Sequence, residues 1–180
     1  LDNSPISSVV LKDMTDALIH RGPDDDALWI EGNVGMGHRR LSIIDLSPAG
    51  RQPMVSYNKR FVLSYNGEIY NFRELRSELE SKGFKFRSKT DSEVVLNALV
   101  EWGSKALMRF NGMFALALWD CKERTLLLAR DRYGIKPLYV SLQGNIFSFG
   151  SEQKAILKSS GFKRKLDKPA LFEYFTFQNI

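Results

Sequence analysis

The chain has 180 residues, which suits one domain with a substantial buried core. Hydrophobic residues make up 43% and charged residues 26%, as in ordinary globular proteins, and the net charge is only +5. Basic residues gather between Lys154 and Lys168 without any recognition motif. They therefore indicate a solvated surface, and we expect no nucleic acid partner.

Cys121 is the single cysteine of the sequence, so an internal disulfide is excluded, as suits a reducing compartment. The longest apolar run, Phe114–Trp119, is far too short to cross a bilayer. The first residues lack the charged start and the long apolar block of a signal peptide. We therefore expect a cytoplasmic protein that does not associate with membranes.

Three strands are predicted in the first part of the chain. Alternating apolar residues indicate strands at Ala27–Glu31 and Val34–Ile44, joined by a turn at Gly32-Asn33. A third strand is expected at Phe61–Tyr65 and should end at Asn66-Gly67, because both residues tolerate positive φ.

Two helices should follow. The first is predicted between Asn71, which can cap it, and Gly83, which can end it. The second should begin at the capping box formed by Thr90 and Glu93 and stop at Gly103.

The second half of the chain should return to strands, and the apolar run within it indicates a strand covered on both faces. The expected strands are Met113–Trp119, Thr125–Ala129, Leu138–Leu142 and Ile146–Phe149. Further helices are predicted from Ser151 and from Asp167. This order of elements indicates an α+β protein, in which two helical layers cover antiparallel sheets.

Three phrases stand out: HRGPD from His20, HRRLSIID from His38 and NGEIYN from Asn66. Each has an ordinary structural explanation when it is taken alone. Asn66 would begin a hairpin turn, and Arg40 would be an exposed ion-pair partner on a strand. Asp91 would complement the dipole at the start of a helix.

Other patterns give little support to chemistry. The acidic run Asp24–Asp26 lacks the spacing of a calcium loop, and Gly32–Gly37 lacks the spacing of a phosphate loop. His20 and His38 have no serine-elbow or zinc pattern near them. Cys121 has basic neighbours, which can lower a thiol pKa, yet no histidine is close in sequence, so we interpret it as a turn residue without a catalytic role.

Together and in this order, the phrases resemble the class II, N-terminal-nucleophile glutamine amidotransferase domain, in the form found in asparagine synthetases. The resemblance runs from about Ile6 to the end of the sequence. Further matching phrases are TDSE at Thr90–Glu93, NGMFALALWD at Asn111–Asp120, ARDRYGIKPLY at Ala129–Tyr139 and FGSEQKA at Phe149–Ala155.

The resemblance implies a mechanism in which the first residue of the mature protein is cysteine. Its thiol attacks the side-chain amide of L-glutamine, and its own α-amine, with a pKa near 8, accepts the thiol proton. Ammonia leaves, and water then releases glutamate from the thioester. The side-chain amide of Asn66 and the backbone N–H of Gly67 are implied as the oxyanion hole, where each donor lowers the barrier by roughly 3 kcal/mol.

The family pattern also implies how glutamine is held. Arg40 matches the position that pairs with the α-carboxylate, as a planar bidentate donor can. Asp91 and Glu68 match the positions that hold the α-ammonium group. Leu41 and Ile43 match pocket positions whose backbone contacts the substrate. No metal is implied in this domain.

The sequence departs from the family in one respect, because it begins at Leu1 and no cysteine precedes His20. Either an opening segment lies outside this sequence, or the chain is a natural variant without glutaminase activity. The intact set of Arg40, Asn66, Glu68 and Asp91 favours the first explanation. The alternative function is a non-catalytic domain that binds glutamine or supports a partner, as in relatives of the β-lactam-synthetase type.

The implied fold is the four-layer αββα sandwich of the N-terminal-nucleophile hydrolases, with residues 1–180 forming the amidotransferase domain. This domain is expected to need no cofactor. A C-terminal synthetase domain in the same chain is expected to use ATP and Mg²⁺ to activate the acceptor. Aspartate is the expected acceptor, a sugar acid is the unusual alternative, and a homodimer is left open.

Overall fold

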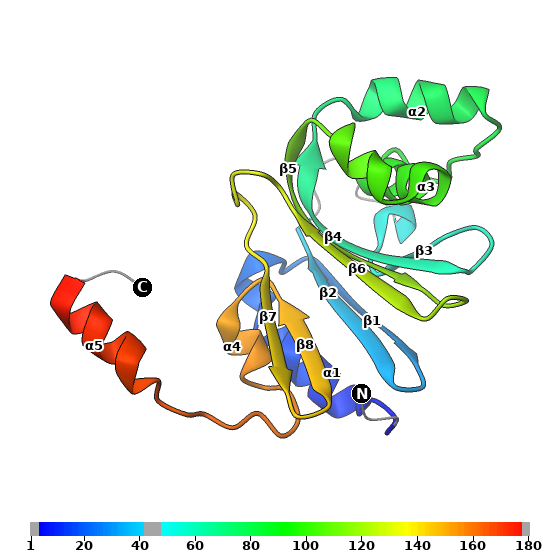
Figure 1. Ribbon diagram of the computed structural model, residues 1–180. Helices are drawn as coiled ribbons and strands as arrows, with labels where there is room; N and C mark the ends of the chain where they lie inside the picture. The colour runs from blue at the N-terminus through cyan, green and yellow to red at the C-terminus, as the bar shows by residue number, and fades with distance from the viewer. Residues whose placement is uncertain (1–3, 42–47, 178–180) are drawn as a thin grey trace.

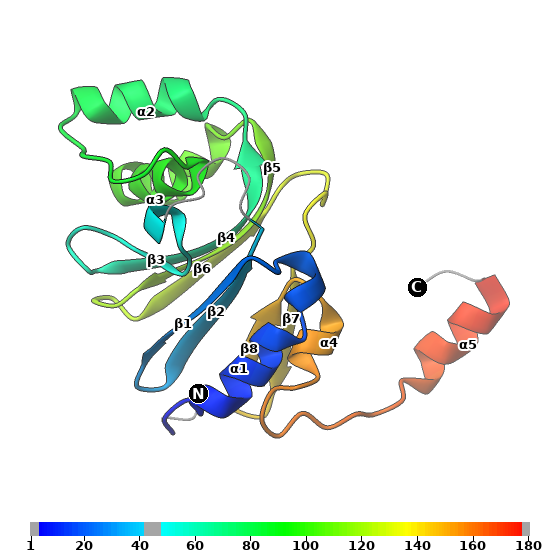
Figure 2. The same cartoon turned by 180° about the vertical axis from the view of Figure 1, so that it is seen from behind.

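The computed structural model describes residues 4–41 and 48–177, which form four layers (Figures 1 and 2). Two helices, α2 (Phe72–Ser81) and α3 (Asp91–Trp102), cover one face of a central sheet. A second β layer of two hairpins lies on the other side of that sheet, and the short helices α1 (Ser8–Asp16) and α4 (Gln153–Ile156) lie outside the hairpins. The predicted α+β class and the αββα layer order are both present.

The central sheet is antiparallel, with strands in the order β3-β4-β5-β6. Its members are β3 (Met54–Val55), β4 (Phe61–Ile69), β5 (Gly112–Asp120) and β6 (Thr125–Arg130). Strands β4 and β5 pair over their whole length, from Phe61 opposite Asp120 to Ile69 opposite Gly112. Because β5 is an inner strand of this sheet, with α2 and α3 on one side and the hairpins on the other, it is buried on both faces, as its apolar run predicts.

The facing layer consists of two hairpins, each a separate two-stranded antiparallel sheet. One hairpin is formed by β1 (Asp25–Glu31) and β2 (Val34–Arg40), and the other by β7 (Tyr139–Gln143) and β8 (Ile146–Gly150). Helix α1 packs on the first hairpin, where Gly37 leaves room for the side chain of Thr15. The 3₁₀ turns η1 (Ile19–Arg21), η2 (Pro48–Gly50) and η3 (Gly103–Met108) complete the connections.

The last helix, α5 (Lys168–Phe177), stands apart from the four layers in both views. Its start agrees with the prediction, because the carboxylate of Asp167 accepts a hydrogen bond from the Ala170 N–H at 3.1 Å. None of its residues is buried. Among the described residues, no helix is long and apolar enough to cross a membrane.

Several sequence-based predictions were wrong in detail. The Asn66-Gly67 pair is not a turn but the interior of β4, which continues to Ile69 because its pairing with β5 continues. Strand β2 ends at Arg40 rather than at Ile44, and residues 42–47 lie outside the described ranges. Asn71 precedes α2 without capping it, because its side chain instead binds the main chain of residues 109 and 111.

Candidate functional site

A cavity of about 1410 Å³ lies between the central sheet and the two hairpins. It is lined by most of the residues that the family resemblance places at the glutamine site: Arg40, Leu41, Asn66, Gly67, Glu68 and Asp91. These residues come from the end of β2, the second half of β4 and the start of α3. The fold therefore brings together segments that are far apart in sequence.

Asn66 lies on the face of β4 that is turned toward the hairpins, as alternation along a strand requires. Its neighbours Val62 and Ala117 on this face pack against Met36 of β2. The Nδ2 atom of Asn66 is buried, yet it makes no hydrogen bond within the described part of the chain. Since a buried donor without a partner costs about 1–3 kcal/mol, this amide is suited to an acceptor that enters the cavity.

Gly67 is required by the close approach of β5. A Cβ at this position would lie 2.8 Å from the Cα atom of Phe114, which is too close for any side chain. Gly67 and Phe114 are paired in the ladder. The absence of a side chain therefore has a structural cause in the sheet, while the residue also lines the cavity.

Asp91 is the first residue of α3 and is only 6% exposed. Its carboxylate accepts hydrogen bonds from the hydroxyl of Tyr65 at 2.8 Å and from the N–H of Ile69 at 3.1 Å. Burial raises the pKa of this carboxyl, although both hydrogen bonds oppose the rise. Asp91 thus faces inward, as the resemblance implies, and a nearby cation would stabilise its ionised form.

Glu68 is exposed at the mouth of the cavity, two residues beyond Asn66 on the same face of β4. Its negative charge contributes to the raised pKa values of Asp91 and of Tyr65. Two carboxylates therefore repel each other here. An ammonium group bound between them would relieve this repulsion, so the pair is suited to a primary amine.

Arg40 ends β2 and is buried, with 9% of its surface exposed. The guanidinium lies against η2, where a Cβ on Gly50 would be only 3.0 Å from the Cζ atom of Arg40. The ordinary explanation of Arg40 as an exposed ion-pair partner therefore does not hold, because the side chain is buried. Burial, and then the charge of Arg40, lowers the pKa of His38.

The resemblance also assigns backbone contacts with the substrate to Leu41 and Ile43. Leu41 lines the cavity but leaves 56% of its surface exposed, at the point where β2 has ended. Ile43 lies outside the described residues.

Three further residues that line the cavity were not predicted as site residues: His38, Gln52 and Ser64. His38 is partly buried, and its ring lies 3.1 Å from the hydroxyl of Ser64, a contact that joins β2 to β4. Burial lowers the pKa of His38 from 6.5 to about 4, so the ring is neutral near pH 7. Gln52 is buried beside Tyr65. A lone Gln or Ser has no sequence signal, whereas His38 opens one of the distinctive phrases.

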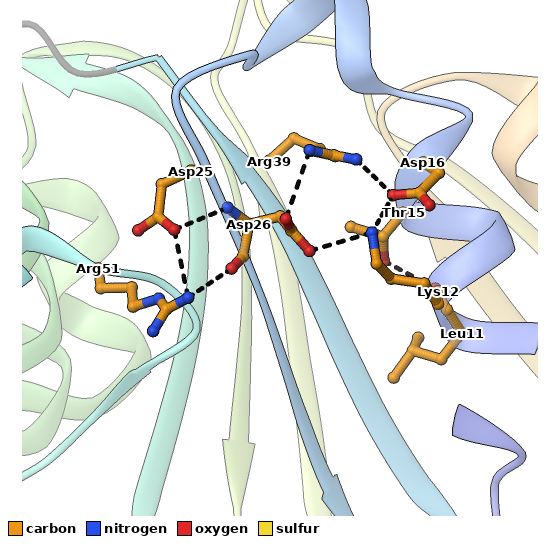
Figure 3. Close-up of polar contacts among 8 residues, drawn as sticks. All are labelled: Leu11, Lys12, Thr15, Asp16, Asp25, Asp26, Arg39 and Arg51. Carbon is orange, nitrogen blue, oxygen red and sulfur yellow. Dashed lines mark hydrogen bonds and ion pairs between the residues drawn. The ribbon is translucent and has the colours of Figure 1, made fainter. Parts of the chain in front are cut away.

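Asp25 and Asp26, in the acidic run that lacks the spacing of a calcium loop, form ion pairs with basic side chains (Figure 3). Asp26 lies 3.2 Å from the ammonium group of Lys12 and 3.5 Å from the guanidinium of Arg39. Both cations also contact Asp16, so the pairs fasten α1 to the first hairpin. Within the described ranges, no three His, Cys, Asp or Glu side chains gather in a way that could hold a metal ion.

The same run also binds the segment that follows η2. The Nη2 atom of Arg51 is 3.2 Å from the carboxylate of Asp25 and donates to the carbonyl of Asp26 at 2.7 Å. Arg40 is the β-ladder partner of Asp25. Arg40, at the end of β2, and Arg51, directly after η2, are therefore both bound to the start of β1.

Cys121 lies far from the cavity residues of β4. It follows Asp120, the partner of Phe61 at the opposite end of the strand from Asn66, about 20 Å away along β5. Burial and the nearby carboxylate of Glu31 raise the pKa of its thiol, so its basic neighbours do not activate it.

The fold and the grouping of residues around the cavity define a class of protein. A model of the glutamine amidotransferase domain family matches residues 2–180, so the chain belongs to that family. Its particular relatives are asparagine synthetases. Asparagine synthetase [glutamine-hydrolyzing] 3 of Bacillus subtilis is 44% identical over 164 residues, which are 90% of this chain and 26% of that protein. The corresponding enzyme 1 of that organism is 40% identical over 171 residues, 95% of this chain and 27% of that protein.

The solved structure of glutamine phosphoribosylpyrophosphate amidotransferase from B. subtilis has the same fold, with a TM-score of 0.60. It is 24% identical in sequence, and the match covers 71% of this chain and 29% of that chain. The predicted amidotransferase fold and family are confirmed. The chain spans about a quarter of the length of the curated relatives that it matches.

Proposed function

We propose that this domain hydrolyses L-glutamine and supplies the ammonia to a synthetase domain in the same protein. The observation that carries the proposal is the buried Nδ2 atom of Asn66, which has no hydrogen-bond partner among the residues that the structure describes and faces a cavity also lined by Arg40, Glu68 and Asp91. This set offers a donor for an oxyanion, a cation for a carboxylate and two anions for an ammonium group.

Glutamine carries all three matching groups. Its α-carboxylate would pair with Arg40, and its α-ammonium would lie between Asp91 and Glu68, where it relieves their repulsion. The side-chain amide would then lie at Asn66 and Gly67. Their N–H groups would stabilise the negative oxygen that develops when a thiol attacks the amide carbon.

The nucleophile in this proposal is an N-terminal cysteine, as the family resemblance implies. The thiol proton passes to the cysteine's own α-amine and then to the leaving nitrogen, so ammonia departs and a thioester forms. Water attacks the thioester and releases glutamate. We assign no part of this chemistry to Cys121, because its thiol pKa is raised and it is remote from Asn66.

The similarity to asparagine synthetases supports a C-terminal synthetase domain that uses ATP and Mg²⁺, with aspartate as the acceptor. The described residues of this domain carry none of that step. Ammonia that reaches the synthetase domain from solution would bypass the glutamine cavity. The two nitrogen sources therefore separate the function of this domain from that of the whole protein.

The test is Asn66→Asp in the full-length protein. Aspartate replaces the NH₂ donor with a negative charge that faces the developing oxyanion. Glutamine-dependent turnover should fall by about 100-fold or more, the usual scale for the loss of one such donor. Synthesis from free ammonia should persist, and both rates are measured on the same preparation.

Leu157→Ala is a suitable control, because Leu157 is partly exposed, follows α4 and does not line the cavity. It should leave both rates within about twofold of the wild type. If Asn66→Asp lowers both activities equally, Asn66 has a structural role and the assignment fails. If the wild-type protein binds glutamine without turning it over, the alternative of a non-catalytic binding domain holds.

A further inference from the structure

Gln52 has an unusual place beside the cavity. It is 7% exposed, and its side-chain amide binds one residue of β4 twice. The Oε1 atom accepts a hydrogen bond from the N–H of Tyr65 at 2.7 Å, and the Nε2 atom donates to the carbonyl of Tyr65 at 3.0 Å. The side chain therefore satisfies both backbone groups of a buried strand residue.

The register of the sheet explains this arrangement. Strand β3 pairs with β4 only at Met54 and Val55, with Met54 opposite Leu63. If the ladder continued by two residues, Gln52 would lie opposite Tyr65. The paired strand stops before that point, and the intervening Pro53 has no N–H to donate. The amide of Gln52 thus supplies, from a side chain, the donor and acceptor that a backbone partner would have supplied.

The same amide also reaches the helix that carries Asp91. Its Nε2 atom is 3.4 Å from the hydroxyl of Ser92, the second residue of α3. The hydroxyl of Tyr65 in turn donates to Asp91 at 2.8 Å. Gln52 therefore binds the residue directly before Asn66 and the residue directly after Asp91.

We propose that Gln52 is a positioning residue that fixes Asn66 relative to Asp91. This role rests on the proposed glutaminase function, since it concerns the distance between the oxyanion donor and the site of the α-ammonium group. The two bonds to Tyr65 are short and buried, so their loss would free β4 where it carries the oxyanion donor. Displacement of a reacting geometry by about 1 Å can cost about 100-fold in rate.

The main variant is Gln52→Met in the full-length protein, because methionine has a similar length but cannot make these hydrogen bonds. Glutamine-dependent kcat should fall by about 10- to 100-fold, and KM should rise by a smaller factor. The reason is that the two hydrogen bonds of Gln52 to Tyr65, next to Asn66, are shorter than its contact with Ser92, next to Asp91. Ammonia-dependent synthesis should stay within about twofold of the wild type. Both parameters come from steady-state kinetics with L-glutamine.

Gln143→Met is a matched control. The amide of Gln143 also binds one backbone residue twice, through the N–H of Lys163 at 2.7 Å and its carbonyl at 3.4 Å. It lies at the end of β7, so its loss should change neither activity by more than about twofold. A second variant, Gln52→Glu, keeps the acceptor but turns an oxygen toward the Tyr65 carbonyl, and it should lose as much glutamine-dependent turnover as Gln52→Met.

Three outcomes separate the hypotheses. If wild type and Gln143→Met turn over glutamine and Gln52→Met matches them within threefold, the positioning role is wrong and the proposed function stands. If both Gln52 variants lose glutamine-dependent and ammonia-dependent activity together, or neither folds, Gln52 serves stability alone. If the wild-type protein does not turn over glutamine, the proposed function fails, and the role of Gln52 fails with it.

Discussion

The two faces of the central sheet differ in what covers them. Toward α2 and α3 the sheet is sealed by an apolar cluster with fifteen buried members, whereas the cluster on the hairpin side has four, counted over the described residues. Strand β4 contributes to both faces. Leu63 and Tyr65 point into the larger cluster, while Ser64 and Asn66, which alternate with them along the strand, line the cavity.

This contrast shows how the fold supports a polar cavity. The backbone of β4 is held in place by close packing against α2 and α3. Because successive side chains of a strand point to opposite faces, this packing leaves the residues on the cavity face free to be polar. The outer layer has less apolar surface to bury and relies on ion pairs, such as those of Asp26 and Glu152. We therefore expect substitutions behind the sheet to change stability most, and those in the outer layer to act more weakly.

The largest effect on stability is expected for Leu79→Ala in α2. Leu79 is 0% exposed within the larger cluster, so the change removes buried methyl groups and leaves a cavity. The free energy of unfolding should fall by about 2–5 kcal/mol, measured by urea denaturation. Leu142→Ala on β7 is the control, because Leu142 is 66% exposed and its loss should cost less than about 0.5 kcal/mol. Equal losses for both variants would contradict the proposed difference between the layers.

The next effect concerns His38, which joins the two β layers through Ser64. Burial, then the charge of Arg40, lowers the pKa of His38 from 6.5 to about 4, while Asp25 opposes this shift. The unfolded chain therefore takes up a proton more readily, and stability should decrease as pH falls from about 6.5 toward 4. A single group with this shift accounts for at most roughly 3 kcal/mol.

The measurement is the free energy of unfolding at pH 7 and at pH 4.5. His38→Gln should lose much of the acid-dependent decrease, whereas His20→Gln, at an exposed histidine, should keep it. A wild-type protein as stable at pH 4.5 as at pH 7 would show that His38 is not buried in the neutral form.

Much of the sandwich could be predicted from local sequence, because its strands and helices carry strong periodic patterns. The capping residue Thr90 was located correctly, since its hydroxyl accepts a hydrogen bond from the Glu93 N–H. The prediction of a turn at Asn66-Gly67 was wrong because tertiary pairing overrides the local preference. Local preference favours a hairpin there, but nine paired residues of β5 keep β4 extended through both positions. The N-terminal helix α1 and the short strand β3 were not predicted, because their apolar patterns are short.

The candidate site could be predicted only through the resemblance, because none of its residues has a local signal for chemistry. Asp91 reads as an ordinary first-turn acid, and only the fold shows that it faces inward. Gln52 could not be found from sequence at all. Its importance depends on the register of β3 and β4 and on the neighbouring proline, which no periodicity reveals.

A smaller effect is expected for Glu152→Gln, which tests the ion pairs of the outer layer. The Glu152 carboxylate lies 2.8 Å from His20, 3.1 Å from Arg21 and 3.0 Å from Lys154, and these contacts, that of His20 first, lower its pKa from 4.5 to about 2. Its stabilising contribution is therefore present above about pH 4.5 and is lost as pH falls toward 2.

At pH 7 the variant should be less stable by at most about 1 kcal/mol, because the partners are partly exposed to solvent. The difference from the wild type should vanish near pH 2. Glu80→Gln removes the surface ion pair between Glu80 and Arg76 on α2 and should cost still less. A loss comparable to that of Leu79→Ala would mean that the outer layer is not the weaker one.

The smallest effect is expected for Cys121→Ser. Cys121 is only partly buried beside the smaller cluster, and its backbone N–H binds the carbonyl of Arg60 at 2.8 Å, a contact that serine keeps. The free energy of unfolding should change by less than about 1 kcal/mol. Glutamine-dependent turnover of the full-length protein should stay within a few-fold of the wild type, because the thiol lies about 20 Å along the strand from Asn66 and its pKa is raised. A thousand-fold loss of turnover in a variant of unchanged stability would identify Cys121 as the nucleophile and would move the active site to the opposite end of β5.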